Sequence, residues 1–223
     1  PRAPKPRRVA AQMRETERAG GGGAIAAPAL ARESVASAVA ELVRGDAEED
    51  AEDAEAGTLV LAASAAAADE WVQALVLRLG PAAGVLRHAT TATARRRNLS
   101  RAPVVVATYA HAGRDDPAPA TELDGWLSAS RQERPTGSML HRVAWTRVVF
   151  DEAHSLLGAS KRATSAASLR ADRAWCVFGP AKLDQLPRQP KQLRAMGKLL
   201  RHVGPCAGLL ADAIRVDSYG DAW

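Results

Sequence analysis

The stretch VVFDEAHSLL, residues 148–157, joins a hydrophobic run to two adjacent carboxylates. Its first three residues are apolar without alternation, which predicts a strand that is buried on both faces. Asp151 and Glu152 follow directly, and His154 comes two residues later. Ligands of open α/β sheets bind at the carboxyl ends of the strands. The two acids therefore stand where a functional site is expected.

Further apolar runs of strand length occur on both sides of this stretch. We expect strands at 24–27, 58–63, 103–108, 146–151 and 174–178. Helical periodicity separates them, with helices expected at 34–44 and 69–79. Strands without a polar face that alternate with helices predict an α/β fold. Its sheet is expected to be mostly parallel and covered by helices on both faces.

Composition sets the broad class of the protein. The chain of 223 residues has 47% hydrophobic residues and a formal net charge of +5, which permits a polyanionic partner without requiring one. Cys176 and Cys206 match neither a metal site nor a disulfide framework, so a reducing compartment is expected. The sequence shows no signal-peptide pattern and no apolar run long enough to span a bilayer. We expect an intracellular protein that is neither secreted nor bound in a membrane.

The chain is expected to form one lobe with two extensions. The expected units are a basic N-terminal arm at 1–18 that leads into a short helix, the lobe at 19–203 and a C-terminal extension at 204–223. Within the lobe, the acidic stretch 46–56 is expected to be a solvated loop. Residues 111–140, with three prolines and little periodicity, are expected to be an inserted loop. The four glycines at 20–23 are expected to form a flexible break.

The stretch AWTRVVFDEAHSLLGASKRATSAASLRADRAWCVFGP, residues 144–180, resembles the corresponding part of Swi/Snf-type helicase-like ATPases. TLVLAAS (58–64) looks like motif Ia of that family, and VVVATYAHA (104–112) looks like motif Ib. MRETERAGGGGAIAA (13–27) is similar to the run into the P-loop in the branch that contains helicase-like transcription factor. The resemblance covers roughly residues 13–203, in the same order.

This resemblance implies a RecA-like three-layer lobe, the first of two lobes in an ATP-dependent DNA translocase. Its cofactors would be ATP and Mg²⁺, and its partner would be DNA. By position, Asp151 and Ser34 would hold Mg²⁺, Glu152 would orient the attacking water, and His154 would couple this motif to its neighbours. Ser64 of motif Ia and Thr108 and Tyr109 of motif Ib would lie along the nucleic acid.

The P-loop departs from the family pattern, which ends in Gly-Lys-Ser/Thr. Here Arg32 stands in the place of the glycine, Glu33 in that of the lysine and Ser34 in that of the Mg²⁺ ligand. Glu33 puts a negative charge where a triphosphate should lie, and Arg32 adds a side chain where the backbone must approach closely. Retained ATP binding would need another cation, for which Arg32 is the nearby candidate. We expect lost or weak ATP binding.

Two further departures weaken the enzymatic interpretation. FGPAKLDQL, residues 178–186, replaces the family's Thr-Gly-Thr-Pro motif and keeps only its glycine clearly. Nothing after residue 203 resembles a second lobe, which carries the family's arginine finger. The family has an upstream glutamine that reads the adenine, and Gln12 lies too close to the P-loop for that position. Asp151 and Glu152 then have a second interpretation, as a hydrogen-bonded cap of the sheet edge, and His154 as an ordinary hydrogen-bonding residue.

Two basic clusters stand out, the first with no acid between its members and the second with Asp184 as the one acid between its members. The first is Arg87, Arg95, Arg96, Arg97 and Arg101; the second is Lys182, Arg188, Lys191, Arg194, Lys198 and Arg201. Each is either a solvated surface or a set of phosphate contacts, with Arg95, Arg96 and Arg97 as the candidates in the first cluster.

Two classes of function therefore stay open. One is a translocase fragment that hydrolyses ATP together with a second lobe on another chain. The other is a degenerate lobe that binds protein or nucleic acid, or serves as a structural module. A compartment that contains DNA, such as a nucleus, is expected in either case.

Overall fold

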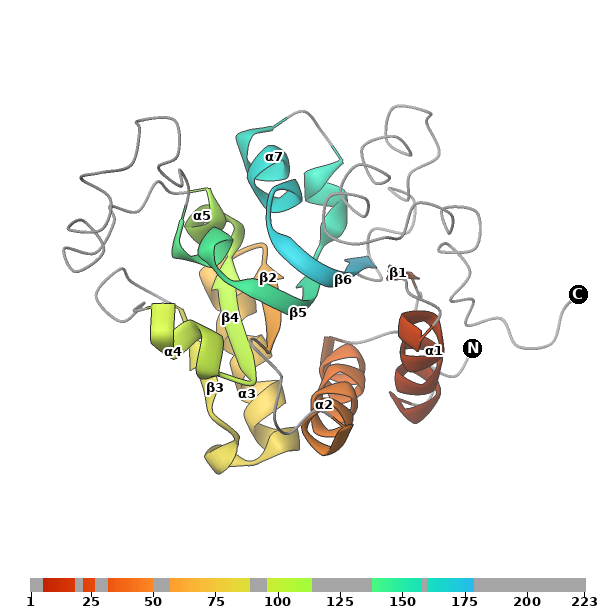
Figure 1. Ribbon diagram of the computed structural model, residues 1–223. Helices are drawn as coiled ribbons and strands as arrows, with labels where there is room; N and C mark the ends of the chain where they lie inside the picture. The colour runs from red at the N-terminus through yellow and green to blue at the C-terminus, as the bar shows by residue number, and fades with distance from the viewer. Residues whose placement is uncertain are drawn as a thin grey trace, which may run out of the picture.

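A single parallel sheet organises the chain in the computed structural model, which describes residues 6–18, 22–26, 32–49, 57–88, 96–113, 138–157 and 160–178. The sheet has six strands in the order β1-β6-β5-β2-β4-β3, and all neighbours are parallel (Figure 1). The strands are β1 (Gly23–Ala26), β2 (Thr58–Ala62), β3 (Val85–Arg87), β4 (Val104–Thr108), β5 (Ala144–Phe150) and β6 (Arg170–Phe178).

Helices connect the strands and cover both faces of the sheet. The described helices are α1 (Pro6–Arg18), α2 (Arg32–Glu49), α3 (Ala65–Leu79), α4 (Arg96–Arg101), α5 (Tyr109–Ala112) and α7 (Lys161–Ala167), with 3-10 turns η1 (Pro81–Ala83), η2 (Met139–Arg142) and η3 (Ala153–Leu156). Two of them have a serine at the N-cap: Ser64 accepts from the Ala67 amide and Ser160 from the Ala163 amide, both at 3.1 Å.

Alternate residues of each strand enter two separate hydrophobic cores. Leu59 and Leu61 of β2 face a core that the short helices α4, α5 and α7 complete. Val60 and Ala62 face the other core, which lies under α1, α2 and α3. Figure 1 shows α5 and α7 on one side of the sheet and α2 and α3 on the other. The expected three-layer α/β architecture is therefore confirmed.

The glycine run before β1 has a packing role where the structure describes it. A Cβ atom on Gly22 would meet the carbonyl oxygen of Ala174 at 1.9 Å, and one on Gly23 would meet the Trp175 ring at 2.9 Å. The backbone before and within β1 therefore approaches β6 too closely for a larger residue. The prediction of a flexible break is wrong for these two glycines.

Other boundaries differ from the sequence prediction. The short helix expected at the end of the basic arm 1–18 is present and takes up most of the arm: α1 spans Pro6–Arg18 and packs against α2 through Val9 and Met13. Helix α2 continues through Asp46–Glu49, where an acidic loop was predicted at 46–56. The ends of the predicted loop 111–140 are helical, and its middle lies outside the described residues, as do 204–223.

Strand β3 was not predicted. It has three residues, all of them partly exposed, so it lacks the long apolar run that marked the other strands. No helix among the described residues is long and apolar enough to cross a membrane.

Candidate functional site

Asp151 lies at the carboxyl end of β5, near the centre of the sheet. Its main-chain amide donates to the carbonyl oxygen of Leu61 at 2.9 Å, which extends the pairing of β5 with β2 by one residue. Its side chain is 5% exposed. The prediction that this carboxylate emerges where the buried strand ends is confirmed, and the carboxylate is covered by protein.

The group that covers it is the guanidinium of Arg32. Arg32 is the first residue of α2, and its Nε lies 3.3 Å from Oδ2 of Asp151. Its Nη1 pairs with the carboxylate of Glu70 in the first turns of α3. One guanidinium therefore joins the start of α2, the start of α3 and the end of β5.

The pKa of Asp151 is raised above its ordinary value. Burial is the main cause, because it disfavours the charged carboxylate, and the charge of Glu152 adds to the effect. The guanidinium of Arg32 and the indole of Trp71 act in the opposite direction and lower the pKa of Asp151. Arg32 thus compensates part of the burial cost and does not remove it.

Glu152 has the left-handed backbone conformation, with φ 53° and ψ 45°. Among the described residues it is the one non-glycine residue with positive φ. This conformation costs on the order of 1–2 kcal/mol in a non-glycine residue and persists when the surroundings hold it. The Glu152 carboxylate is turned towards His154, whose Nδ1 lies 3.2 Å from Oε2.

Tyr109 holds the chain at this turn. Its hydroxyl donates to the carbonyl oxygen of Asp151 at 2.6 Å, directly before the strained residue. The ring is buried, and burial together with the charge of Asp151 raises the pKa of Tyr109 well above its ordinary value. The phenol stays protonated and keeps donating. Burial of the whole side chain does not favour the predicted contact of Tyr109 with nucleic acid.

The other residues predicted along a nucleic acid serve as helix caps. Thr108 caps α5: its hydroxyl accepts from the His111 amide, while Nδ1 of His111 accepts from the Thr108 amide at 3.3 Å. Ser64 caps α3 and is exposed. Arg95 lies outside the described residues, and of Arg96 and Arg97 only the backbone, in α4, is described.

The basic clusters are described only in part. Arg87 pairs with Asp69 of α3 at 2.9 Å, so its charge is partly neutralised. Arg101 is exposed at the end of α4. The second cluster lies entirely outside the described residues, as does 179–186 of the predicted motif FGPAKLDQL.

The described residues at this edge place a cation and an acid where the resemblance would put the nucleotide. Arg32 lies on the carboxylate that would hold the metal, and Glu33 is exposed one residue further along α2. Ser34, in the same turn, is partly exposed. Within the part of the chain that the structure describes, no three acidic, histidine or cysteine side chains are grouped to hold a metal ion.

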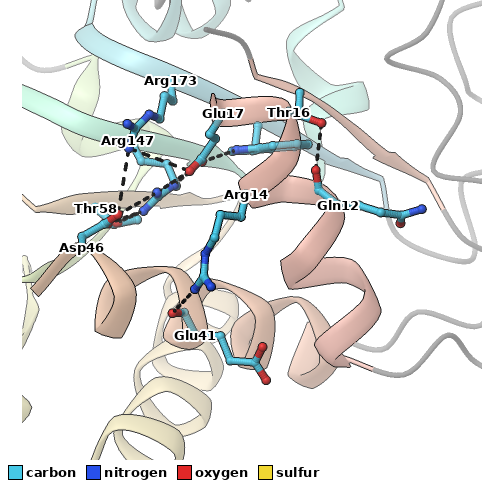
Figure 2. A network of polar contacts seen from close by, with 10 residues as sticks. Gln12, Arg14, Thr16, Glu17, Glu41, Asp46, Thr58, Arg147 and Arg173 are labelled. Carbon is cyan, nitrogen blue, oxygen red and sulfur yellow. Dashed lines mark hydrogen bonds and ion pairs between the residues drawn. The ribbon is translucent and has the colours of Figure 1, made fainter. Parts of the chain in front are cut away.

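A second polar cluster lies at the middle of β5, beside the start of β2, and was not predicted from the sequence. We call it the Arg147 cluster: Glu17, Asp46, Thr58, Arg147, Arg173 and Trp175. Figure 2 shows Arg147 of β5 reaching the acids of α1 and α2. Arg147 has no exposed surface, and the Glu17 side chain is 4% exposed.

The donors of Arg147 and the acceptors of Glu17 both have hydrogen-bond partners within the Arg147 cluster. Nε and Nη2 of Arg147 donate to the two carboxylate oxygens of Glu17, and Nη1 donates to Asp46 at 2.9 Å and to Thr58 at 3.0 Å. The Trp175 indole donates to Glu17 at 2.8 Å. Burial acts to lower the pKa of Arg147, but hydrogen bonds and the charges of Glu17 and Asp46 outweigh it and raise that pKa.

A signal for this cluster existed in the sequence. Arg147 interrupts the apolar run WTRVVF, and a buried charge requires a partner. Its partners stand 130 and 101 residues earlier in the chain, so spacing could not identify them.

The parallel sheet with this strand order and with helices on both faces gives the chain a RecA-like fold. Comparison with protein families and with curated proteins gives no match. Solved structures do match. The Sulfolobus solfataricus SWI2/SNF2 ATPase core in complex with dsDNA has 16% identity and a TM-score of 0.59, over 94% of this chain.

Two more structures support the same fold. The Sulfolobus solfataricus SWI2/SNF2 ATPase core domain matches with 17% identity, a TM-score of 0.56 and 94% of this chain. The Pyrococcus furiosus Hef helicase domain matches with 16% identity, a TM-score of 0.51 and 90% of this chain. This chain spans 36%, 35% and 37% of the three structures, respectively. At these identities the matches show the fold, the RecA-like lobe of helicase-like proteins.

Proposed function

We propose that this chain is a degenerate first lobe of a Swi/Snf-type DNA translocase, which keeps the fold, has lost Mg·ATP binding, and serves to bind protein or nucleic acid. The observation that carries the proposal is the position of Arg32. Its guanidinium lies on Asp151, which is the carboxylate that would bind the metal by resemblance.

The charge of the site also supports the proposed loss of Mg·ATP binding. Apart from Arg32, the described groups around it are the acids Glu33, Glu70, Asp151 and Glu152. A triphosphate that approached this edge would meet more negative than positive charge. One pair of unit charges 4 Å apart is worth about 4 kcal/mol at an effective dielectric constant near 20, so the reversed sign at Glu33 alone is large.

Calorimetric titration with Mg·ATP tests the loss of binding. The wild-type chain should give no saturable heat at millimolar nucleotide. The variant Arg32→Gly/Glu33→Lys restores the family residues and removes the guanidinium from Asp151, so it should bind more tightly than wild type. A wild-type isotherm in the micromolar range would refute the proposal and favour the second candidate, an active fragment that hydrolyses ATP with a second lobe on another chain. The retained Asp151, Glu152 and His154 favour that candidate.

Duplex DNA is the nucleic acid that the comparisons suggest, because one matching ATPase core was solved with dsDNA. The net charge of +5 is compatible with weak binding through phosphate contacts. No base-reading element is identified, so binding should be independent of sequence and should fall steeply with salt.

Fluorescence anisotropy with two unrelated duplexes across a salt series tests this part. Replacing Arg95, Arg96 and Arg97 by alanine should weaken binding to both duplexes equally and flatten the logarithmic salt slope by about 0.9 per lost phosphate contact. The matched control replaces three exposed arginines elsewhere, Arg78, Arg162 and Arg170, with the same change in charge. Equal loss in both triple variants would mean that net charge alone drives binding. If neither duplex binds even at low salt, the nucleic-acid part of the proposal fails and a protein partner is the one that stays proposed.

A further inference from the structure

Helix α2 is fixed to β5 by an ion pair at each end, and the two pairs have opposite polarity. At the start of α2, Arg32 contacts Asp151 at the end of β5. Near the end of α2, Asp46 contacts Arg147 of β5 at 2.9 Å. The helix supplies the cation at one end and the anion at the other.

The ion pairs define the position of α2 along its axis more sharply than the apolar contact does. The buried side of α2 combines alanine with larger residues: Ala36, Ala38 and Ala40 are 0–1% exposed, and Val35, Val39 and Leu42 are 0–2% exposed. Apolar contact has no direction, whereas the energy of an ion pair depends on the distance between its two charges. A shift of α2 by one turn, about 5.4 Å, would separate both ion pairs at once.

In a P-loop protein the bound nucleotide connects the start of this helix to the carboxylate that follows the central strand, because phosphates lie on the helix N-terminus and the metal lies on the carboxylate. Here Arg32 makes that connection from within the chain, and Glu70 holds the same guanidinium from α3. Both partners of this contact belong to the chain itself.

We infer that the two ion pairs lock α2 onto the sheet, so that this lobe stays in one conformation and does not respond to nucleotide. The inference rests on the proposed function, and it adds a mechanism: Arg32 substitutes for the ligand as an internal contact. The lobe then presents a constant surface to its partner.

Hydrogen–deuterium exchange of α2 tests the lock. The amides to follow are those from Ala36 onward, because the first four amides of a helix have no intrahelical acceptor. In the wild-type chain, uptake in 36–46 should be the same with and without Mg·ATP. Arg32→Gln should accelerate exchange in the first half of this segment by about tenfold, the size of a typical coupling between contacting charges. Asp46→Asn should accelerate exchange by a similar factor in the second half of residues 36–46.

Arg44→Gln is the matched control. Arg44 lies on the same helix and is exposed, and its guanidinium donates to the carbonyl oxygen of Arg78. It should change exchange by less than about threefold. Circular dichroism verifies that every variant is folded; Arg32 and Asp46 are 26% and 29% exposed, so both should tolerate the change.

The outcomes separate the lock from the proposed function. If Arg32→Gln accelerates exchange no more than Arg44→Gln, the lock is refuted even where calorimetry finds no nucleotide binding. If wild type binds Mg·ATP but α2 still depends on Arg32, the proposed function fails and the lock stands. Nucleotide-dependent protection of α2 in wild type would refute both.

Discussion

Replacing Arg147 by methionine tests the polar cluster that joins α1 and α2 to the sheet. The substitution removes every guanidinium contact and keeps an apolar stem of similar length. Glu17, whose side chain is 4% exposed, would retain the indole of Trp175 at 2.8 Å and Arg173 at 3.8 Å. Removing one partner of a buried pair costs about 3–5 kcal/mol, because the other charge stays buried without compensation.

The measurement is equilibrium unfolding in urea, followed by circular dichroism. With a slope of about 2 kcal/mol/M, a loss of about 4 kcal/mol lowers the midpoint by about 2 M. The double variant Arg147→Met/Glu17→Leu removes both buried charges and should recover most of the loss, because well-packed apolar replacements of buried pairs are close to neutral. Arg173→Met is the control: at 33% exposure and 3.8 Å from Glu17 it should cost less than about 1 kcal/mol.

A loss below about 1 kcal/mol in Arg147→Met, with unchanged slope, would refute the reasoning. It would mean that the Glu17 carboxylate is hydrated or finds another cation. If Arg147→Met does not fold, Glu17→Gln gives the same information, since it keeps the shape and removes the charge, with an expected loss of about 1.5–3 kcal/mol.

Three further outcomes follow from the site. Tyr109→Phe removes the donor to the Asp151 carbonyl and should lower the free energy of unfolding in urea by about 1–3 kcal/mol; no loss would mean that water replaces the hydroxyl. The pKa of Asp151 is raised in the folded state, so the unfolded chain loses this proton at a lower pH than the folded chain. The free energy of unfolding of the wild-type protein should therefore fall as the pH rises from 3.8 through the folded pKa. Asp151→Asn should remove that part of the pH dependence; a constant difference between the two proteins across this window contradicts the assignment. Ser64→Ala should cost about 0.5–2 kcal/mol as a lost N-cap, whereas Thr164→Ala, on an exposed turn of α7, should cost less; equal losses would show that the cap is unimportant.

The sheet could be predicted because its central strands are buried on both faces. Such strands appear as unbroken apolar runs, and this signal needs no knowledge of what packs on them. The change of sign at Glu33 was equally readable, because it depends on one position. The contact of Arg32 with Asp151 was not, since it joins positions far apart in the chain and depends on how α2 lies on the sheet.

Helix α1 shows why a local pattern misleads. Val9, Met13 and Glu17 stand four residues apart, which places them on one face of a helix, and all three are buried. The third position is an acid, so the apolar stripe ends early in the sequence, and the segment is predicted as a basic arm that leads into only a short helix. The buried guanidinium of Arg147 and the indole of Trp175 explain an acid at that place.

The distance along the chain between Glu17 and Arg147 has a consequence for biosynthesis. The two residues are 130 positions apart, and ribosomes add roughly 5–20 residues per second, so Glu17 waits about 6–26 s before its partner is made. Strand β1 waits longer still, because its neighbour β6 is the last described strand of the chain. During synthesis, α1 and β1 therefore leave the ribosome long before the strands that hold them, and the central strands must assemble first. We expect a nascent chain halted before residue 147 to be cut by protease within residues 6–26. A nascent chain halted well beyond residue 178 should be protected within the same residues.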